Sequence, residues 1–306
     1  MNKKLVVSSS PHIRNEVSTR DIMLDVIIAL APAAIFGVIL FRLSAALLIV
    51  SCVLAAVLSE FLWCLITKRP HTIGNLSAVV TGLLLALNLP PKLPVWMGII
   101  GSAVAIIVVE EMFGGLGQIF ANPAITARIV LLVSFPAAMT TFYPPFSDVV
   151  SSATPLAAEP GTYTLNELFL GTHAGSIGET SAFMLLIGFA YLLVRRIISP
   201  VIPLCFVGSA ALFTLCLGGN PLTCILSGGL LLGAIFMATD YVTSPKTPRG
   251  MANFGVGCGI LTVIIREFAS LPEGVSYSIL IMNILTPHIN RLPSFKPFGW
   301  EDNKNA

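Results

Sequence analysis

The chain has 306 residues, of which 55% are hydrophobic and 10% are charged, and its mean hydropathy is +0.89. Soluble domains carry about 25% charged residues, so this composition excludes a soluble protein and indicates an integral membrane protein. The formal net charge of +2 says little about partners. We expect a lipid bilayer around the chain and no nucleic-acid partner.

Apolar stretches separated by short polar or Pro/Gly breaks run through most of the sequence. A helix that spans a bilayer needs about 20 predominantly apolar residues. Strands of a membrane β-barrel would alternate polar and apolar residues, and these stretches do not. We therefore expect an all-α integral membrane protein with about ten transmembrane helices. The expected spans are 22–40, 43–66, 74–90, 94–112, 118–137, 181–195, 200–217, 222–239, 252–268 and 275–288.

The basic residues predict the orientation, because Lys and Arg accumulate on the cytoplasmic side of a membrane. Thirteen of the 17 Lys and Arg residues lie on one set of sides, and the opposite sides hold only Arg42, Lys92 and Arg266. Both termini are therefore expected in the cytoplasm of a bacterial cell, with the chain crossing the inner membrane an even number of times. The segment 138–180, which has no Lys or Arg, then falls on the outer side.

The two halves of the chain share an order of features. Gly82-Leu83-Leu84-Leu85 recurs as Gly229-Leu230-Leu231-Leu232, and each copy leads into a Pro-rich break, at 88–94 and 239–250. Five spans in each half is an odd number, so the halves would be inverted, a plan that often surrounds a central site. The expected division is an N-terminal segment 1–21, a first five-helix repeat 22–137, an outer loop 138–180, a second repeat 181–288 and a C-terminal tail 289–306.

The outer loop contains the run Asp148-Val149-Val150-Ser151-Ser152-Ala153-Thr154-Pro155. This run resembles the acceptor motif of covalently flavinylated proteins, Asp-x-x-Ser/Thr-Gly-Ala-Thr/Ser, except that Ser152 stands where Gly is commoner. In such proteins a flavin transferase joins FMN to the last hydroxyl through a phosphoester, which here would be that of Thr154. Asp148 would help the transferase; Ser151, Ser152 and Ala153 are motif neighbours. The alternative is an ordinary Ser/Thr-rich turn.

Ionisable residues inside membrane segments are costly and are candidates for function. The first candidate for cation coupling or gating is Asp240, in the second-half break, and the second is Glu110. The alternative for either is a structural hydrogen bond or salt bridge, with Arg128 as the partner. The six cysteines fall in apolar segments without a Cys-x-x-Cys pair, so no metal site is expected within this chain.

The whole chain resembles the D subunit of the Rnf complex, a relative of the B subunit of the sodium-translocating NADH:quinone reductase. The resemblance rests on 74–91, on Phe113-Gly114-Gly115 with Asn122-Pro123-Ala124, on Phe236-Met237-Ala238-Thr239-Asp240, and on Thr243-Ser244-Pro245-Lys246-Thr247 with Glu273-Gly274.

The resemblance implies a flavin-bearing subunit of an ion-translocating ferredoxin:NAD oxidoreductase, coupled to Na⁺ or H⁺ transport. It also implies covalent FMN on the outer side, a non-covalent riboflavin whose contacts the sequence does not assign, the other Rnf subunits as partners, and an ApbE-like flavin transferase for maturation. The rival function is an inverted-repeat solute channel or transporter without redox chemistry. A purely structural anchor for partner subunits is disfavoured by the polar residues at both helix breaks.

Overall fold

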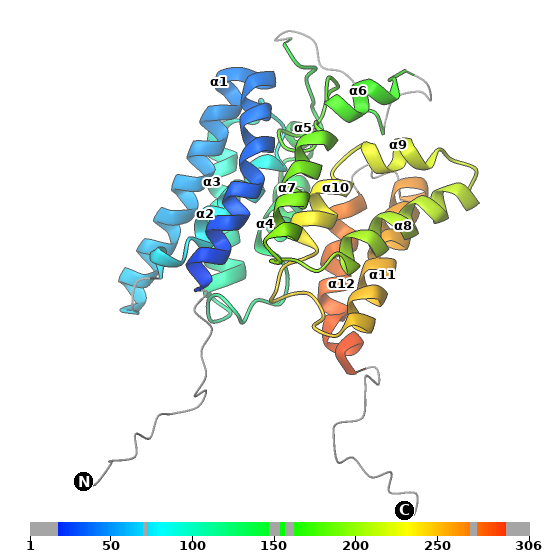
Figure 1. Cartoon of the computed structure of the whole chain (residues 1–306). Helices are drawn as coiled ribbons and strands as arrows, with labels where there is room; N and C mark the ends of the chain where they lie inside the picture. The colour runs from blue at the N-terminus through cyan, green and yellow to red at the C-terminus, as the bar shows by residue number, and fades with distance from the viewer. Residues whose placement is uncertain (1–17, 70–71, 147–153, 157–161, 270–273, 292–306) are drawn as a thin grey trace, which may run out of the picture.

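The computed structural model of the chain describes residues 18–69, 72–146, 154–156, 162–269 and 274–291. Within these ranges all regular secondary structure is helical, which confirms the all-α class. Figure 1 shows the helices of the N-terminal half (blue to cyan) beside those of the C-terminal half (yellow to red), with α7 between them. The first described helix begins, and the last one ends, at the same end of the molecule (Figure 1). We call this the terminal end and the opposite one the distal end.

The first helix, α1 (Thr19–Thr67), consists of two arms that meet at Arg42. Ser18 caps its start, since the Ser18 side chain accepts a hydrogen bond from the backbone N–H of Asp21. Arg42 has φ 57° and ψ −139°, a conformation that interrupts the helix. Figure 1 shows the two arms running antiparallel from a turn at the distal end. The expected spans 22–40 and 43–66 are therefore the two arms of α1.

The remaining helices of the first half pack against these arms. They are η1 (Ile73–Asn75), α2 (Ser77–Leu87), α3 (Val95–Ala103), its π-helical continuation η2 (Val104–Glu111), α4 (Pro123–Ser134) and α5 (Pro136–Met139). A Cβ atom on Gly82 of α2 would lie 2.9 Å from the Cys52 carbonyl oxygen, so α2 and the second arm touch backbone to backbone. The expected span 118–137 is wrong at its start, because Asn122 caps α4 and Pro123 is its first residue.

The second half contains α6 (Leu165–Leu170), α7 (Ala182–Val194), α8 (Val201–Cys216), α9 (Pro221–Leu226), α10 (Leu230–Leu232), the π-helical η3 (Gly233–Met237), α11 (Pro248–Phe268) and α12 (Gly274–Arg291). The expected single span 222–239 is wrong, because it is broken between α9 and α10. The break has a local cause: Gly228 adopts a φ of +67°, which favours glycine and which no right-handed helix contains.

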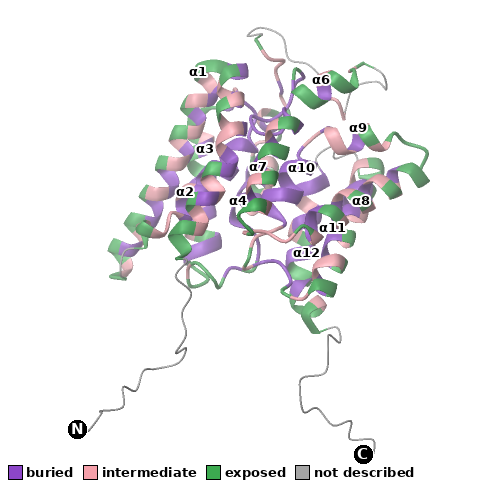
Figure 2. Cartoon of the chain, viewed as in Figure 1, coloured by how far each residue is buried: buried purple, intermediate pink, exposed green. Residues whose placement is uncertain are grey.

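Many large apolar side chains of the described residues are exposed, as a bilayer requires. Figure 2 shows exposed residues on the outward faces of α1, α8 and α11 and buried residues between the two halves. Exposed side chains on α1 include Ile35, Leu43 and Ile66, which are 61%, 70% and 75% exposed. In the part of the chain that the structure describes, two helices are long and apolar enough to span a membrane, α1 and α11, whose most apolar windows have mean hydropathies of 2.5 and 1.3. Shorter apolar helices make up much of the rest.

The last part of the segment 138–180, which the sequence predicts as an outer loop, packs into the interior of the protein. The backbone N–H of Ile177 donates to the Leu89 carbonyl (3.1 Å) and that of Gly178 to the Leu87 carbonyl (2.8 Å), where α2 ends. Residues 173–181 are all buried. This stretch returns into the protein because backbone groups freed at the end of α2 must be satisfied, and here protein satisfies them.

Candidate functional site

The predicted flavin acceptor lies at the distal end. Thr154 is half-buried in the short described stretch 154–156, and the Leu156 side chain packs against Gly228 at the break between α9 and α10. The other motif residues, Asp148, Ser151, Ser152 and Ala153, lie outside the described residues. The sequence places Thr154 in a loop but gives no indication that this loop rests on the broken helix of the second half.

Helix α6 stands beside this stretch and packs on α9 and α7. A capping box fixes its start: the Thr164 side chain accepts from the backbone N–H of Glu167, and the Glu167 carboxylate accepts from the Thr164 backbone N–H at 2.8 Å. These hydrogen bonds, first that from the Thr164 backbone and then that from its side chain, lower the pKa of Glu167 below its usual range. The cap gives the distal surface near Thr154 a defined helix in an otherwise irregular segment.

A buried charge pair joins the two halves at the centre. Arg128 of α4 and Glu179 approach to 3.3 Å, and their side chains are 3% and 4% exposed. Arg128 Nη1 also donates to Asn88 Oδ1 (3.2 Å) at the end of α2 and to Ser276 Oγ (3.0 Å) on α12. A Cβ on Gly229 would lie 2.5 Å from Glu179 Oε1, so the start of α10 closes the other side of this cluster.

Glu179 belongs to the segment expected as an outer loop, and the structure places it in the interior, paired with Arg128. A signal is present in the sequence, because a lone Arg within an apolar span requires a counter-charge, and Glu179 closely precedes the apolar run of α7.

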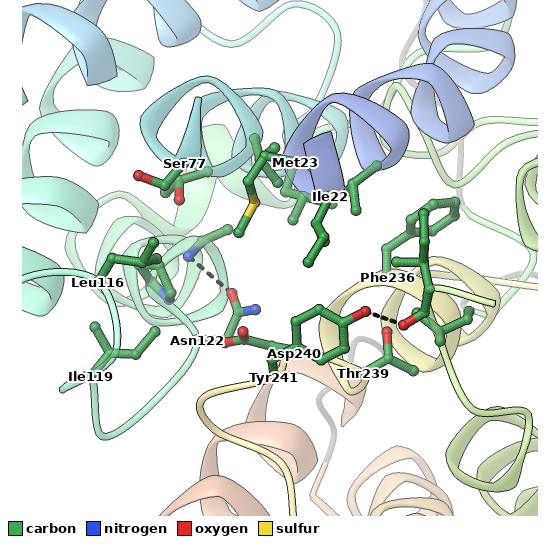
Figure 3. A pocket seen from close by; sticks show the side chains of 18 of the residues that line it. Ile22, Met23, Ser77, Leu116, Ile119, Asn122, Phe236, Thr239, Asp240 and Tyr241 are labelled. Carbon is green, nitrogen blue, oxygen red and sulfur yellow. Dashed lines mark hydrogen bonds between the residues drawn. The ribbon is translucent and has the colours of Figure 1, made fainter. Parts of the chain in front are cut away.

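A pocket opens between the halves towards the terminal end and brings the two ion-coupling candidates together. Figure 3 shows Ser77, Leu116, Ile119 and Asn122 on one side of it and Phe236 and Thr239 on the other. The pocket holds about 740 Å³ of empty space, counting its open mouth. Its lining residues are Ile22, Met23, Val26, Ser77, Val80, Thr81, Leu84, Glu110, Leu116, Ile119, Asn122, Pro123, Ala124, Leu192, Ile197, Ile198, Phe236, Thr239, Asp240 and Tyr241.

Both π-helical segments, η2 and η3, supply walls of this pocket. Glu110, which is 3% exposed, comes from the last turn of the π-helical η2. Asp240 follows the π-helical η3, and its carboxylate accepts from the Thr243 hydroxyl at 3.0 Å and from the Val242 backbone N–H at 3.3 Å. π-Helical turns are rare and often accompany functional sites. The sequence places Asp240 at a break but does not predict that Glu110 lines the same pocket.

A second ion pair joins α7 to the start of α1. Arg195 Nη2 lies 3.0 Å from Asp25 Oδ2, and the Tyr191 hydroxyl donates to Asp25 Oδ1 at 2.7 Å. The Tyr241 hydroxyl donates to the Ile197 carbonyl, and both residues line the pocket. Asp25 is therefore a structural partner that fastens α7 to the start of α1.

The chain is similar in sequence to known proteins of one family. Residues 6–299 match the model of the NQR2, RnfD, RnfE family. The chain is 48% identical over 303 residues to the D subunit of the Na⁺-translocating ferredoxin:NAD⁺ oxidoreductase complex of Acetobacterium woodii, covering 96% of this chain and 95% of the relative. It is 42% identical to the D subunit of the proton-translocating complex of Clostridium ljungdahlii, covering 96% of each. It is 36% identical to the D subunit of the ion-translocating oxidoreductase complex of Stutzerimonas stutzeri, covering 91% of each.

Proposed function

Because the chain belongs to the NQR2, RnfD, RnfE family, we propose that it is the D subunit of an ion-translocating ferredoxin:NAD oxidoreductase, the Rnf complex. The observation that carries this proposal is the match over residues 6–299, which includes both halves and the segment between them. It favours a redox complex over a solute channel. The protein is a membrane component of that complex and not a complete enzyme, and the other Rnf subunits are its partners.

For the arrangement in the membrane, we propose about ten spans in two inverted five-helix halves, 22–137 and 181–288, with 138–180 between them. The two arms of α1 supply the first two spans. Helix α1 starts and helix α12 ends at the same end of the molecule (Figure 1), which supports an even number of membrane crossings. In the bacterial inner membrane, the terminal end would then face the cytoplasm, and Thr154 at the distal end would face outwards.

We further propose that Thr154 carries FMN through a phosphoester that a flavin transferase installs. Thr154 is half-buried at the distal end, and Pro155 restricts it to an extended backbone, which suits access by a modifying enzyme. When attached, the flavin supplies electron transfer, and the tether keeps it at a high local concentration. The role of this chain is to hold the hydroxyl of Thr154 where the transferase and the neighbouring subunits reach it.

We propose that the pocket at the terminal end is the site of the non-covalent flavin, riboflavin. Its lining is mostly aliphatic and aromatic, as is usual for a site that binds a planar ring system. Among the described residues, no Lys, Arg or His lines it. This lining suits riboflavin, which has no phosphate. The hydroxyl and amide groups of Ser77, Thr81 and Asn122 offer hydrogen bonds to a ribityl chain, and the apolar walls exclude water from a ring system.

Filling this pocket is expected to remove the non-covalent flavin. Val26 lies on α1 and lines the pocket, so Val26→Trp should raise the Kd for riboflavin by about 10- to 100-fold, since overpacking costs about 1–3 kcal/mol. Flavin released by denaturing the purified protein, measured by fluorescence, checks this result. The matched control is Ile28→Trp on the same helix, at a residue that is 44% exposed and does not line the pocket. Equal riboflavin in both variants would place the flavin elsewhere.

We propose that Asp240 and Glu110 couple the redox reaction to cation movement. The two carboxyl groups belong to different halves but line one pocket, so a charge that changes in the pocket acts on both. Among the relatives, one is named Na⁺-translocating and another proton-translocating. A carboxylate in a poorly hydrated pocket can bind either cation, which is consistent with a shared position for both ions.

Neutralising these carboxyl groups is expected to separate electron transfer from ion transport. In Asp240→Asn and Glu110→Gln, ferredoxin:NAD electron transfer by the complex should persist while cation uptake by proteoliposomes falls by about tenfold or more, equivalent to about 1.4 kcal/mol. Asp25→Asn serves as a comparison, because Asp25 is held by Arg195 outside the pocket lining. Unchanged ratios of ions to electrons in both pocket variants would exclude this role.

A further inference from the structure

The described stretch 154–156, which contains the proposed acceptor Thr154, contacts the second half at Gly228. Gly228 has a φ of +67° in the break between α9 and α10. A Cβ atom at this position would lie 2.6 Å from Leu156 Cδ1 and 3.1 Å from Arg266 Nη2. Leu156 and the guanidinium of Arg266 therefore converge on the same point of the distal surface.

Arg266 projects from the last turn of α11 onto the end of α9. Its Nη1 donates to the Cys224 carbonyl at 2.9 Å, and its Nη2 donates to the Ser227 carbonyl at 3.2 Å. Its Nε is buried and makes no hydrogen bond in the part of the chain that the structure describes. Both partners are neutral carbonyls, so they orient the guanidinium without compensating its charge.

Among the described residues, no carboxylate forms an ion pair with Arg266. Glu267 is its neighbour on α11, but Glu267 is exposed, and adjacent residues of a helix point about 100° apart. An arginine held by neutral groups at the edge of a membrane protein is well suited to bind a phosphate, since guanidinium donors match phosphate oxygens in geometry and charge.

Thr154 is within reach of this cation. Thr154 and Leu156 are two residues apart, and an extended chain advances about 3.3–3.6 Å per residue, so their Cα atoms are separated by about 7 Å at most. Because Leu156 lies against the glycine that Arg266 also approaches, a phosphoester on the Thr154 hydroxyl can come within contact distance of the guanidinium.

We infer that Arg266 is a positioning residue for the phosphodiester that joins FMN to Thr154. This inference rests on the proposed flavinylation and adds to it a defined binding partner from the second half of the chain. Arg266 compensates the single negative charge of the diester and restrains the tether on the surface formed by Leu156, Gly228 and the end of α9. The flavin would thereby be fixed relative to α11, a long helix, although its attachment point is a loop residue.

The test is a thermodynamic cycle between the modification and the arginine. The wild type and Arg266→Gln are each purified with and without FMN, by expression with and without the transferase, and their Tm values are compared. In the wild type we expect flavinylation to raise Tm, because the diester pairs with Arg266. In Arg266→Gln we expect this rise to disappear, even though the variant also loses the cap on α9 and is less stable in both forms.

Two further variants distinguish this contact from a purely structural role. Arg266→Lys keeps the positive charge and should retain part of the rise, whereas Glu267→Gln changes an adjacent charge and should leave the rise unchanged. If Arg266→Gln does not insert, the fluorescence anisotropy of the bound flavin is compared in the wild type and Arg266→Lys. Anisotropy should fall when the guanidinium fork is lost, because the tether is less restrained.

The failure of the inference is distinguishable from the failure of the proposed function. A wild-type chain that stays unmodified beside an active transferase would overturn flavinylation itself, before any variant is compared. A flavinylated wild type whose rise in Tm is equal in Arg266→Gln, or whose flavin anisotropy is equal in Arg266→Lys, would overturn the contact alone and leave Arg266 as the cap of α9.

Discussion

Thr154→Ala is expected to abolish the covalent flavin completely while the protein remains inserted and folded. The substitution removes the hydroxyl to which we propose that the FMN phosphate is esterified, and alanine offers no group in its place. Thr154 is only half-buried, so the loss of its hydroxyl should cost little stability. The intact mass of the denatured chain should lack one FMN less water, and electron transfer through the complex should fall to background.

Ser151→Ala and Ser152→Ala are the matched controls for this result. Each removes one hydroxyl from the same run, and each should retain the full FMN mass after expression with the transferase. Covalent FMN that persists in Thr154→Ala would move the attachment to another residue. An unmodified wild type, with the transferase active on a known acceptor, would remove the reason for assigning a covalent flavin to this chain.

The features that are predictable from the sequence are those fixed by local residues. The span boundaries near Arg42, Asn88 and Asp240 are set by charges, prolines and turn residues, and the structure interrupts its helices there. The acceptor run proposed around Thr154 is also a local feature, and it stays a prediction from the sequence. The run Ser227-Gly228-Gly229 is also typical of a turn. The mean hydropathy of the surrounding stretch is high enough to conceal this break when the stretch is treated as one span.

The features that the sequence does not reveal depend on contacts between distant parts of the chain. The pocket that joins Glu110 to Asp240, and the packing of Leu156 on Gly228, exist only because the halves meet in space. The burial of Glu179 is hidden for the same reason. The residues next to Glu179 in the sequence are polar. Glu179 is buried because it supplies the counter-charge for Arg128, which lies in an apolar helix of the other half.

Arg128→Met is expected to be the most destabilising single change in the chain. It leaves the Glu179 carboxylate buried, 4% exposed, without its counter-charge, and it removes the donors to Asn88 and Ser276. Breaking a buried ion pair from one side costs about 3–5 kcal/mol, whereas breaking an exposed pair costs about 0–1 kcal/mol. Arg195→Met is the matched control, because Arg195 pairs with Asp25 but its side chain is 55% exposed.

Thermal unfolding in detergent, followed with a thiol-reactive dye, measures this difference, because Cys52, Cys64 and Cys258 are buried and become reactive only when helices separate. Arg128→Met should lower Tm far more than Arg195→Met does. Adding Glu179→Gln to Arg128→Met should restore part of the loss, since the remaining group is then neutral.

Equal Tm values for Arg128→Met and Arg195→Met would mean that water or an ion compensates Glu179, and that the pair does not hold the halves together. A large loss that the second substitution partly restores would show that one charge pair fixes α4 of the first half against the returning segment that precedes α7.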